Sequence, residues 1–117
     1  MTERSVVRAD ALFEAALGLV LLVGAATGAL DASDFPNPVG LFVIAAFGAL
    51  LLVLAYVIWS GQVGVAALAA GNAVTASAAL LWLVLASGFS ATGATIVAIT
   101  VVGLVILATA QVISLRT

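Results

Sequence analysis

From Phe35 to Leu115 the chain runs through 81 consecutive residues without an aspartate, glutamate, lysine, arginine or histidine. The only titratable side chain in this run is that of Tyr56. A soluble domain needs charged side chains on its exposed faces, and about a quarter of the residues in ordinary proteins are charged. Here charged residues make up 7% of the chain and the mean hydropathy is +1.42, so the sequence predicts a protein whose solvent is lipid.

Four apolar segments follow one another, each about 20 residues long or slightly longer, which lets a helix cross a hydrocarbon core of roughly 30 Å. Continuous apolar runs favour helices over the alternating strands of a barrel, since lipid leaves no backbone group unpaired. The segments cover residues 9–30, 39–59, 63–86 and 93–115.

The breaks between these segments are rich in turn-forming residues. Residues 31–38 form a polar stretch with two prolines, and residues 60–64 and 87–93 are short glycine-containing links. Short links make sequential helices antiparallel neighbours. The predicted fold class is therefore all-α: a polytopic membrane protein with one transmembrane domain over residues 1–117, built as an antiparallel bundle of four transmembrane helices.

The arginines predict the orientation in the membrane, because cytoplasmic segments are enriched in positive charge whereas carboxylates contribute little. Arg4, Arg8 and Arg116 flank the two ends of the chain, and no link between the segments carries a positive charge. We therefore expect a multi-pass protein of the cell membrane with both termini cytoplasmic.

The residue types that are missing exclude most classes of active site. The chain has no cysteine and no histidine, which removes disulfides, thiolate nucleophiles, imidazole-based haem and zinc sites and the Ser-His-Asp type of hydrolase. A net charge of −2 without a basic patch argues against nucleic acid as a partner. We expect no enzymatic activity, no cofactor and no bound metal, and membrane lipid as the surrounding partner.

Glu14 is the strongest candidate for a functional side chain, because it lies about one turn inside the first apolar segment. An ionisable residue within a membrane is a functional hypothesis by default. Asp10 precedes it by four residues and shares its helix face. Glu14 is either a proton-exchanging carboxylate or an interfacial side chain that reaches head-group water and bonds a neighbouring helix. Gln111 and Arg116, near the end of the last segment, are its expected partners.

Asn72 is the only carboxamide near the middle of a segment, with Thr75 one turn further along the same face. A buried amide joins helices by bonds worth about 0.6 to 2 kcal/mol in lipid, so a packing contact is favoured over a ligand contact. Tyr56, the one titratable group of the uncharged run, completes a candidate proton or ligand site together with Glu14, Gln111 and Asn72.

The third apolar segment is unusually thin, with alanine or glycine at most positions from Ala66 to Ala79. Small residues let helix backbones approach closely. We therefore expect this segment to be the central, closely packed helix, with Gly71, Thr75 and Ala79 as its contact ridge. Residues 24–28 offer a second small-residue motif, GxxxG, on the first helix.

Four spans in a short chain with a glutamate at position 14 resemble the small multidrug resistance transporters, and residues 55–61, AYVIWSG, are similar to the tyrosine and tryptophan motif of that family. The resemblance implies that Glu14 binds protons and cationic drugs in an antiparallel dimer. The chain departs from the pattern in two ways. Tyr56 and Trp59 close the second segment here, whereas the family motif opens the third helix. The family also has aromatic residues around the glutamate, whereas the helix-face neighbours of Glu14 are Asp10, Ala11, Leu17 and Gly18.

A second resemblance covers most of the chain and links it to uncharacterised small four-helix bacterial integral membrane proteins. It consists of an arginine entering the first helix, an asparagine early in the third, a Thr-Gly pair opening the fourth and a final glutamine followed by arginine. In this chain these are Arg8, Asn72, Thr92 with Gly93, and Gln111 with Arg116. The resemblance implies the same four-helix fold and no particular activity.

Two functions fit these observations. The first is a non-catalytic helix bundle that acts as an accessory subunit of a larger membrane complex, or as a small homo-oligomer binding lipid or another apolar molecule between its helices. The alternative is a proton-coupled small-solute transporter or channel that uses Glu14, with Asn72 and Tyr56 along its path. Whether Glu14 faces a water-accessible cavity distinguishes the two.

Overall fold

The computed structural model describes residues 2–116, which form four α-helices and one short 3-10 helix and contain no strand. The elements are α1 (Glu3–Thr27), η1 (Ala32–Asp34), α2 (Leu41–Trp59), α3 (Val65–Leu85) and α4 (Ala91–Arg116). The all-α prediction is confirmed, and the bounds of α2, α3 and α4 lie within two residues of the apolar segments. Hydrophobicity locates these three helices because their apolar residues continue to the turns on either side.

The first helix begins six residues earlier than the apolar segment predicts. Its start is fixed by capping: Thr2 is the N-cap, and its Oγ1 accepts a hydrogen bond of 3.1 Å from the backbone N–H of Ser5. Charged side chains are compatible with a helix. The polar residues that precede the apolar segment therefore form the first turns of α1. The helix ends at Thr27, because Gly28 adopts the left-handed conformation with φ of 80°.

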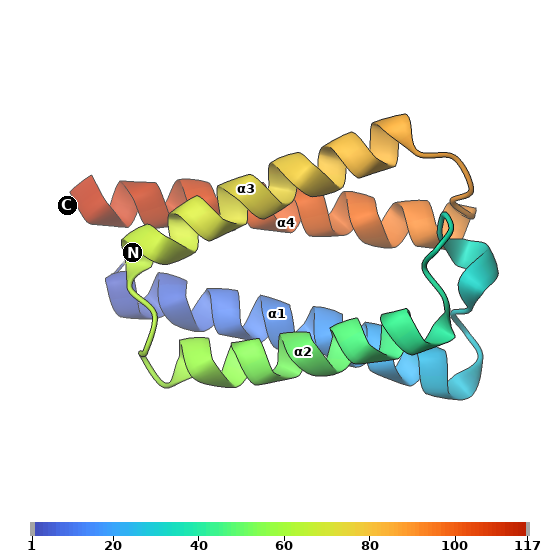
Figure 1. Ribbon diagram of the computed structural model, residues 1–117. Coiled ribbons are helices and arrows are strands. Elements are labelled where there is room, and N and C mark those ends of the chain that lie inside the picture. Colours follow the sequence, from blue (N-terminus) through green and yellow to red (C-terminus); the bar gives the residue numbers. More distant parts are fainter. Residues whose placement is uncertain (1, 117) are drawn as a thin grey trace.

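The four helices are arranged as two antiparallel hairpins (Figure 1). α1 packs along α2 and α3 packs along α4, while α1 also makes a shorter contact with α4 and a brief one with α3. α2 makes no extensive approach to α3 or α4, although the link to α3 is short. The molecule measures 44 × 27 × 17 Å, and its bundle is open between α2 and α3.

The backbones of α1 and α2 approach each other closely at two glycines. A Cβ atom added to Gly18 would lie 2.7 Å from the carbonyl oxygen of Gly48, and one added to Gly48 would lie 2.8 Å from that of Gly18. α1 also contacts α3 and α4, and this makes α1 the central helix of the bundle.

The expectation that the third helix is central is wrong. A Cβ atom on Gly71 would meet no atom within 4 Å, and Thr75 on the same ridge is exposed. The small residues of α3 reduce the width of the helix, but no other helix backbone packs against Gly71. The GxxxG motif makes no helix contact either, because Gly24 is covered by Leu30 and Gly28 ends α1 with open space around it.

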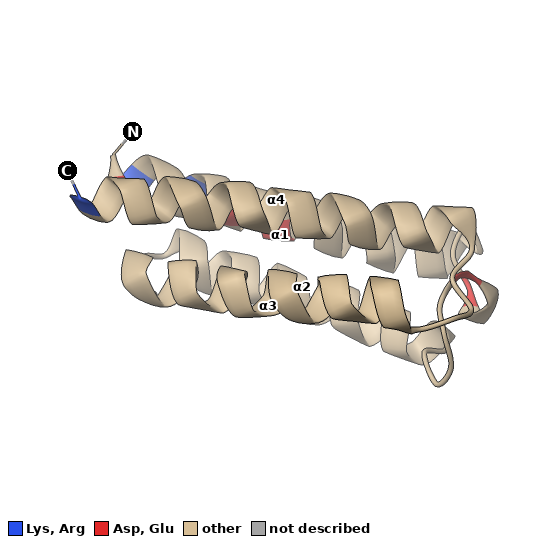
Figure 2. Ribbon diagram, turned by 90° about the horizontal axis from the view of Figure 1, so that it is seen from above, with Lys and Arg blue, Asp and Glu red and all other residues tan. Residues whose placement is uncertain are grey.

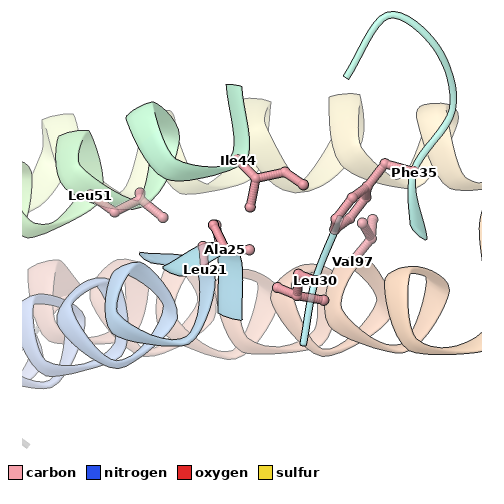
Figure 3. Packing of buried hydrophobic residues seen from close by; sticks show 7 residues of the cluster. All are labelled: Leu21, Ala25, Leu30, Phe35, Ile44, Leu51 and Val97. Carbon is pink, nitrogen blue, oxygen red and sulfur yellow. The ribbon is translucent and has the colours of Figure 1, made fainter. Parts of the chain in front are cut away.

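The larger of the two buried apolar clusters is drawn in Figure 3, and it includes residues on both sides of η1. Its buried members come from α1, α2, α4 and the α1–α2 link: Leu21, Ala25, Leu30, Phe35, Ile44, Leu51 and Val97. Phe35 also stacks on Trp82 of α3 with ring centroids 6.3 Å apart, and Phe89 meets Trp82 edge to face at 4.8 Å. These aromatic contacts join the two hairpins at the η1 end.

The charges concentrate on α1 and at the two ends of the molecule (Figure 2). The start of α1 and the end of α4 lie at one end, with the arginines, and η1 lies at the other with Asp34 and its N-cap residue, Asp31. Within residues 2–116, three helices are long and apolar enough to cross a membrane: α2, α3 and α4. α1 is as long as these, but it contains five of the eight charged residues of the chain.

Candidate functional site

A buried cluster of polar side chains joins α1, α3 and α4. The Oδ2 atom of Asp10 accepts one hydrogen bond of 2.6 Å from Nδ2 of Asn72 and another of 2.6 Å from Nε2 of Gln111. Nδ2 of Asn72 also donates to Oε1 of Gln111 at 3.1 Å. The three side chains form a closed ring of hydrogen bonds in which each residue comes from a different helix.

The helix ends bring these residues to the same depth. Asp10 lies seven residues after the start of α1, Asn72 seven residues after the start of α3, and Gln111 five residues before the end of α4. At a rise of 1.5 Å per residue, each side chain lies about 8 to 10 Å inside the same end of the molecule. Asp10 and Gln111 are 0% exposed and Asn72 is 7% exposed.

Glu14 lies one turn beyond Asp10 on the same face of α1, and it is 6% exposed. No hydrogen bond or ion pair joins it to another residue in the described part of the chain. The Oδ1 atom of Asp10 is also buried and lacks a hydrogen-bond partner among those residues. The site therefore contains two neighbouring carboxyl groups, of which only Asp10 receives hydrogen-bond donors.

Apolar side chains close the site toward the end of the molecule that holds the arginines. Ala11 of α1, Ile58 of α2 and Leu68 of α3 form a small buried cluster there, with Val7 and Val63 packed against it. Arg8 does not enter the site, because its guanidinium group lies over the ring of Trp59 at 4.8 Å.

Three of the four side chains singled out in the sequence lie in this region, and the fourth does not. Glu14, Asn72 and Gln111 are buried together, whereas Tyr56 is 72% exposed on α2. The partner expected for Glu14 is different in the structure, because Gln111 bonds Asp10 instead.

Arg116, the other expected partner of Glu14, is exposed and makes no ion pair with it in the described residues. From the sequence, Asp10 is only a neighbour of Glu14 on the same helix face, and its place in the ring of hydrogen bonds is a finding of the structure. The four-residue spacing of the two acids was the signal that could have identified it, because that spacing places both on one helix face.

A groove of about 410 Å³ lies between the two hairpins, on the open side of the bundle. All its lining side chains are apolar except two threonines. They are Leu17 and Leu21 of α1; Phe35 and Val39 of the link; Val43, Ile44 and Phe47 of α2; Thr75, Ala78, Ala79 and Trp82 of α3; and Ile96, Val97 and Thr100 of α4.

The groove begins about one turn from the polar cluster. On α1, Leu17 follows Glu14 by three residues, and on α3, Thr75 follows Asn72 by three residues. The interior is therefore divided along its length into a polar part near the arginine end and an apolar part toward η1.

The residues present limit the chemistry of this site. Among the described residues, no group of three or more His, Cys, Asp or Glu side chains could hold a metal ion. The carboxyl groups can bind a proton, the side-chain amides can donate hydrogen bonds, and the groove can bind an apolar molecule. In comparisons with protein-family models, curated proteins and solved structures, no match to this chain was found.

Proposed function

We propose that this chain is an integral protein of the cell membrane in which α1 crosses the bilayer together with α2, α3 and α4. Three helices have the length and composition of membrane spans, and α1 packs along the most apolar of them, α2. The charges of α1 that would be unfavourable in lipid are either near its start or buried against α3 and α4. The arginines support a cytoplasmic location for both termini.

Within the membrane, the protein acts without catalysis by binding an apolar molecule between its two hairpins, either alone, as a homo-oligomer or as a subunit of a larger complex. The observation that carries this proposal is the groove, which is almost wholly apolar and opens where α2 and α3 are apart. At the depth of the hydrocarbon core, this opening faces the acyl chains of the lipids. The occupant we propose is therefore an acyl chain of a membrane lipid.

The proposal is tested with a phospholipid that carries a photoactivatable group in its acyl chain. The protein is reconstituted with this lipid, irradiated, and digested to map the crosslinks. We expect crosslinks on the groove walls, and we expect Ala78→Phe to reduce them by filling the groove. Ala73→Phe is the matched control, because Ala73 is also exposed on α3 and is not part of the groove lining. Equal labelling of both variants and the wild-type protein would contradict the proposal.

A second candidate function is proton-coupled transport of a small solute by Glu14, in which the protein works as a transporter or channel. The observation that favours it is the pair of buried carboxyl groups, because membrane proteins rarely retain such groups without a role. Addition of a lipophilic cation to the purified protein should then release protons, and Glu14→Gln should abolish the release. A flat titration in both proteins would exclude this function.

A further inference from the structure

Asp10 and Glu14 are buried one turn apart on α1 without a cation beside them in the described residues. Two like charges this close in a medium of low dielectric cannot both remain ionised without a compensating positive charge. We infer that Asp10 and Glu14 hold one proton between them, which Glu14 carries and donates to Oδ1 of Asp10. The structure thereby contains a proton site made of a fixed anion and a protonated neighbour.

The hydrogen bonds assign the two roles. Oδ2 of Asp10 accepts from both Asn72 and Gln111 at 2.6 Å, and these two donors compensate its negative charge. Glu14 receives no such donor from the described residues. A proton on Glu14 removes its charge and provides the donor that Oδ1 of Asp10 lacks. One proton therefore neutralises Glu14 and gives Oδ1 of Asp10 a hydrogen-bond donor. Its binding breaks no covalent bond.

The other charged and titratable groups near the site do not replace this proton. α3 contains no ionisable side chain, and the only one on α2 is Tyr56, which is exposed. α4 contributes Gln111 to the site, while its one charged residue, Arg116, is exposed. On α1, Arg8 lies over Trp59, and Glu3 and Arg4 are exposed near the helix start.

The inference is tested by infrared spectroscopy of the full-length protein in lipid bilayers. Of the five carboxylate side chains in the chain, those of Asp10 and Glu14 are buried, whereas those of Glu3, Asp31 and Asp34 are exposed or partly exposed to water. A carbonyl band of a protonated carboxyl group must then come from Asp10 or Glu14. We expect one such band, lost in Glu14→Gln, retained but shifted in frequency in Asp10→Asn, and unchanged in the control Glu3→Gln.

Isotope labelling makes the test independent of whether the variants fold. In the unmutated protein, ¹³C in the glutamate carboxyl groups should shift the band and ¹³C in the aspartate carboxyl groups should not. Absence of a band at neutral pH, or a shift with labelled aspartate, would overturn the inference. A band that disappears when sodium chloride replaces choline chloride would also overturn it, because the site would then bind a metal ion.

This inference deepens the second candidate function without depending on transport. If the band is present but no lipophilic cation releases protons, the pair holds a proton and the transport proposal fails. If protons are released although the band is absent, another group supplies them and the inference fails. The spectrum and the proton-release titration therefore separate the two.

Discussion

Gly18 of α1 and Gly48 of α2 face each other so closely that neither position has room for a side chain. An added Cβ on either residue would lie within 2.8 Å of the partner's carbonyl oxygen. Both neighbouring atoms are backbone atoms, so they cannot move aside without moving a helix. This contact fixes the spacing of the α1–α2 hairpin.

Gly18→Ala and Gly48→Ala should each destabilise the protein by about 1 to 3 kcal/mol, the usual cost of inserting a methyl group into a closely packed contact. Thermal unfolding in detergent, followed by circular dichroism, measures the effect. Gly71→Ala is the matched control, because a Cβ there meets nothing within 4 Å. The control should be neutral or stabilise by up to about 1 kcal/mol, because alanine favours a helix over glycine. Equal effects at all three positions would show that the contact is absent.

Asn72→Ala should loosen the attachment of α3 to α1 and α4. The change removes two hydrogen bonds, to Asp10 and to Gln111, and leaves Asp10 with one donor. Each such bond within a membrane is worth about 0.6 to 2 kcal/mol. Unfolding by sodium dodecyl sulfate from mixed micelles should therefore occur at lower detergent fraction than in the wild-type protein.

Ser77→Ala is the control for this change, because Ser77 is on the same helix and its hydroxyl bonds only the carbonyl of Ala73. Its unfolding should remain within about 0.5 kcal/mol of the wild-type protein. If Asn72→Ala behaved like Ser77→Ala, the ring of hydrogen bonds would contribute nothing to stability.

The sequence predicted the helices well because one signal dominates it, the continuous apolar segment. It located α2, α3 and α4 within two residues, and it missed the first turns of α1 because these are polar. The packing was harder to predict. Small residues mark where backbones can approach, so Gly71 and Gly48 look alike in the sequence, and only the partner helix distinguishes them.

The candidate site was predicted in composition but not in pairing. Few polar residues lie within the apolar segments, so Glu14, Asn72 and Gln111 stood out from the sequence alone. Which of them bond each other depends on helix rotation, and apolar residues on every face of the helices leave this rotation undetermined. For the same reason, neither the role of Asp10 nor the open groove beside α2 could be derived.

The link at the other end of the molecule should depend on the hydroxyl of Ser90. This hydroxyl donates to Oδ1 of Asp34 at 2.6 Å and accepts from the backbone N–H of Gly93 at 3.0 Å, which caps the start of α4. Ser90→Ala should cost about 0.5 to 2 kcal/mol, as for other lost caps. Hydrogen exchange should become faster in η1 and in the first turn of α4. Ser90→Thr keeps the hydroxyl and should retain protection; equal exchange in both variants would contradict this role.

The pKa of Asp31 lies below the ordinary aspartate value, because its carboxylate accepts hydrogen bonds from the hydroxyl and the backbone N–H of Ser33. A group with a lowered pKa in the folded state stabilises above its ordinary value, near pH 4, and this contribution is lost as the pH falls through the lowered value. Ser33→Ala removes the hydroxyl donor and should raise the pKa toward the ordinary value. The ¹³C carboxyl shift of Asp31, followed by NMR against pH, measures this, and an unchanged midpoint would contradict it.

Single cysteines should report the orientation in the membrane, because the chain has no cysteine of its own. Ala32 and Gln62 are both exposed, and they lie in the links at the opposite ends of α2, Ala32 in η1 before it and Gln62 in the link to α3. The end that contains Gln62 also contains Arg4, Arg8 and Arg116, so the positive-inside rule predicts that this end is cytoplasmic. A membrane-impermeant maleimide should therefore label Ala32→Cys in intact spheroplasts, and Gln62→Cys only after permeabilisation. The reverse pattern would invert the orientation, and labelling of both in intact spheroplasts would show that α2 does not separate the two compartments.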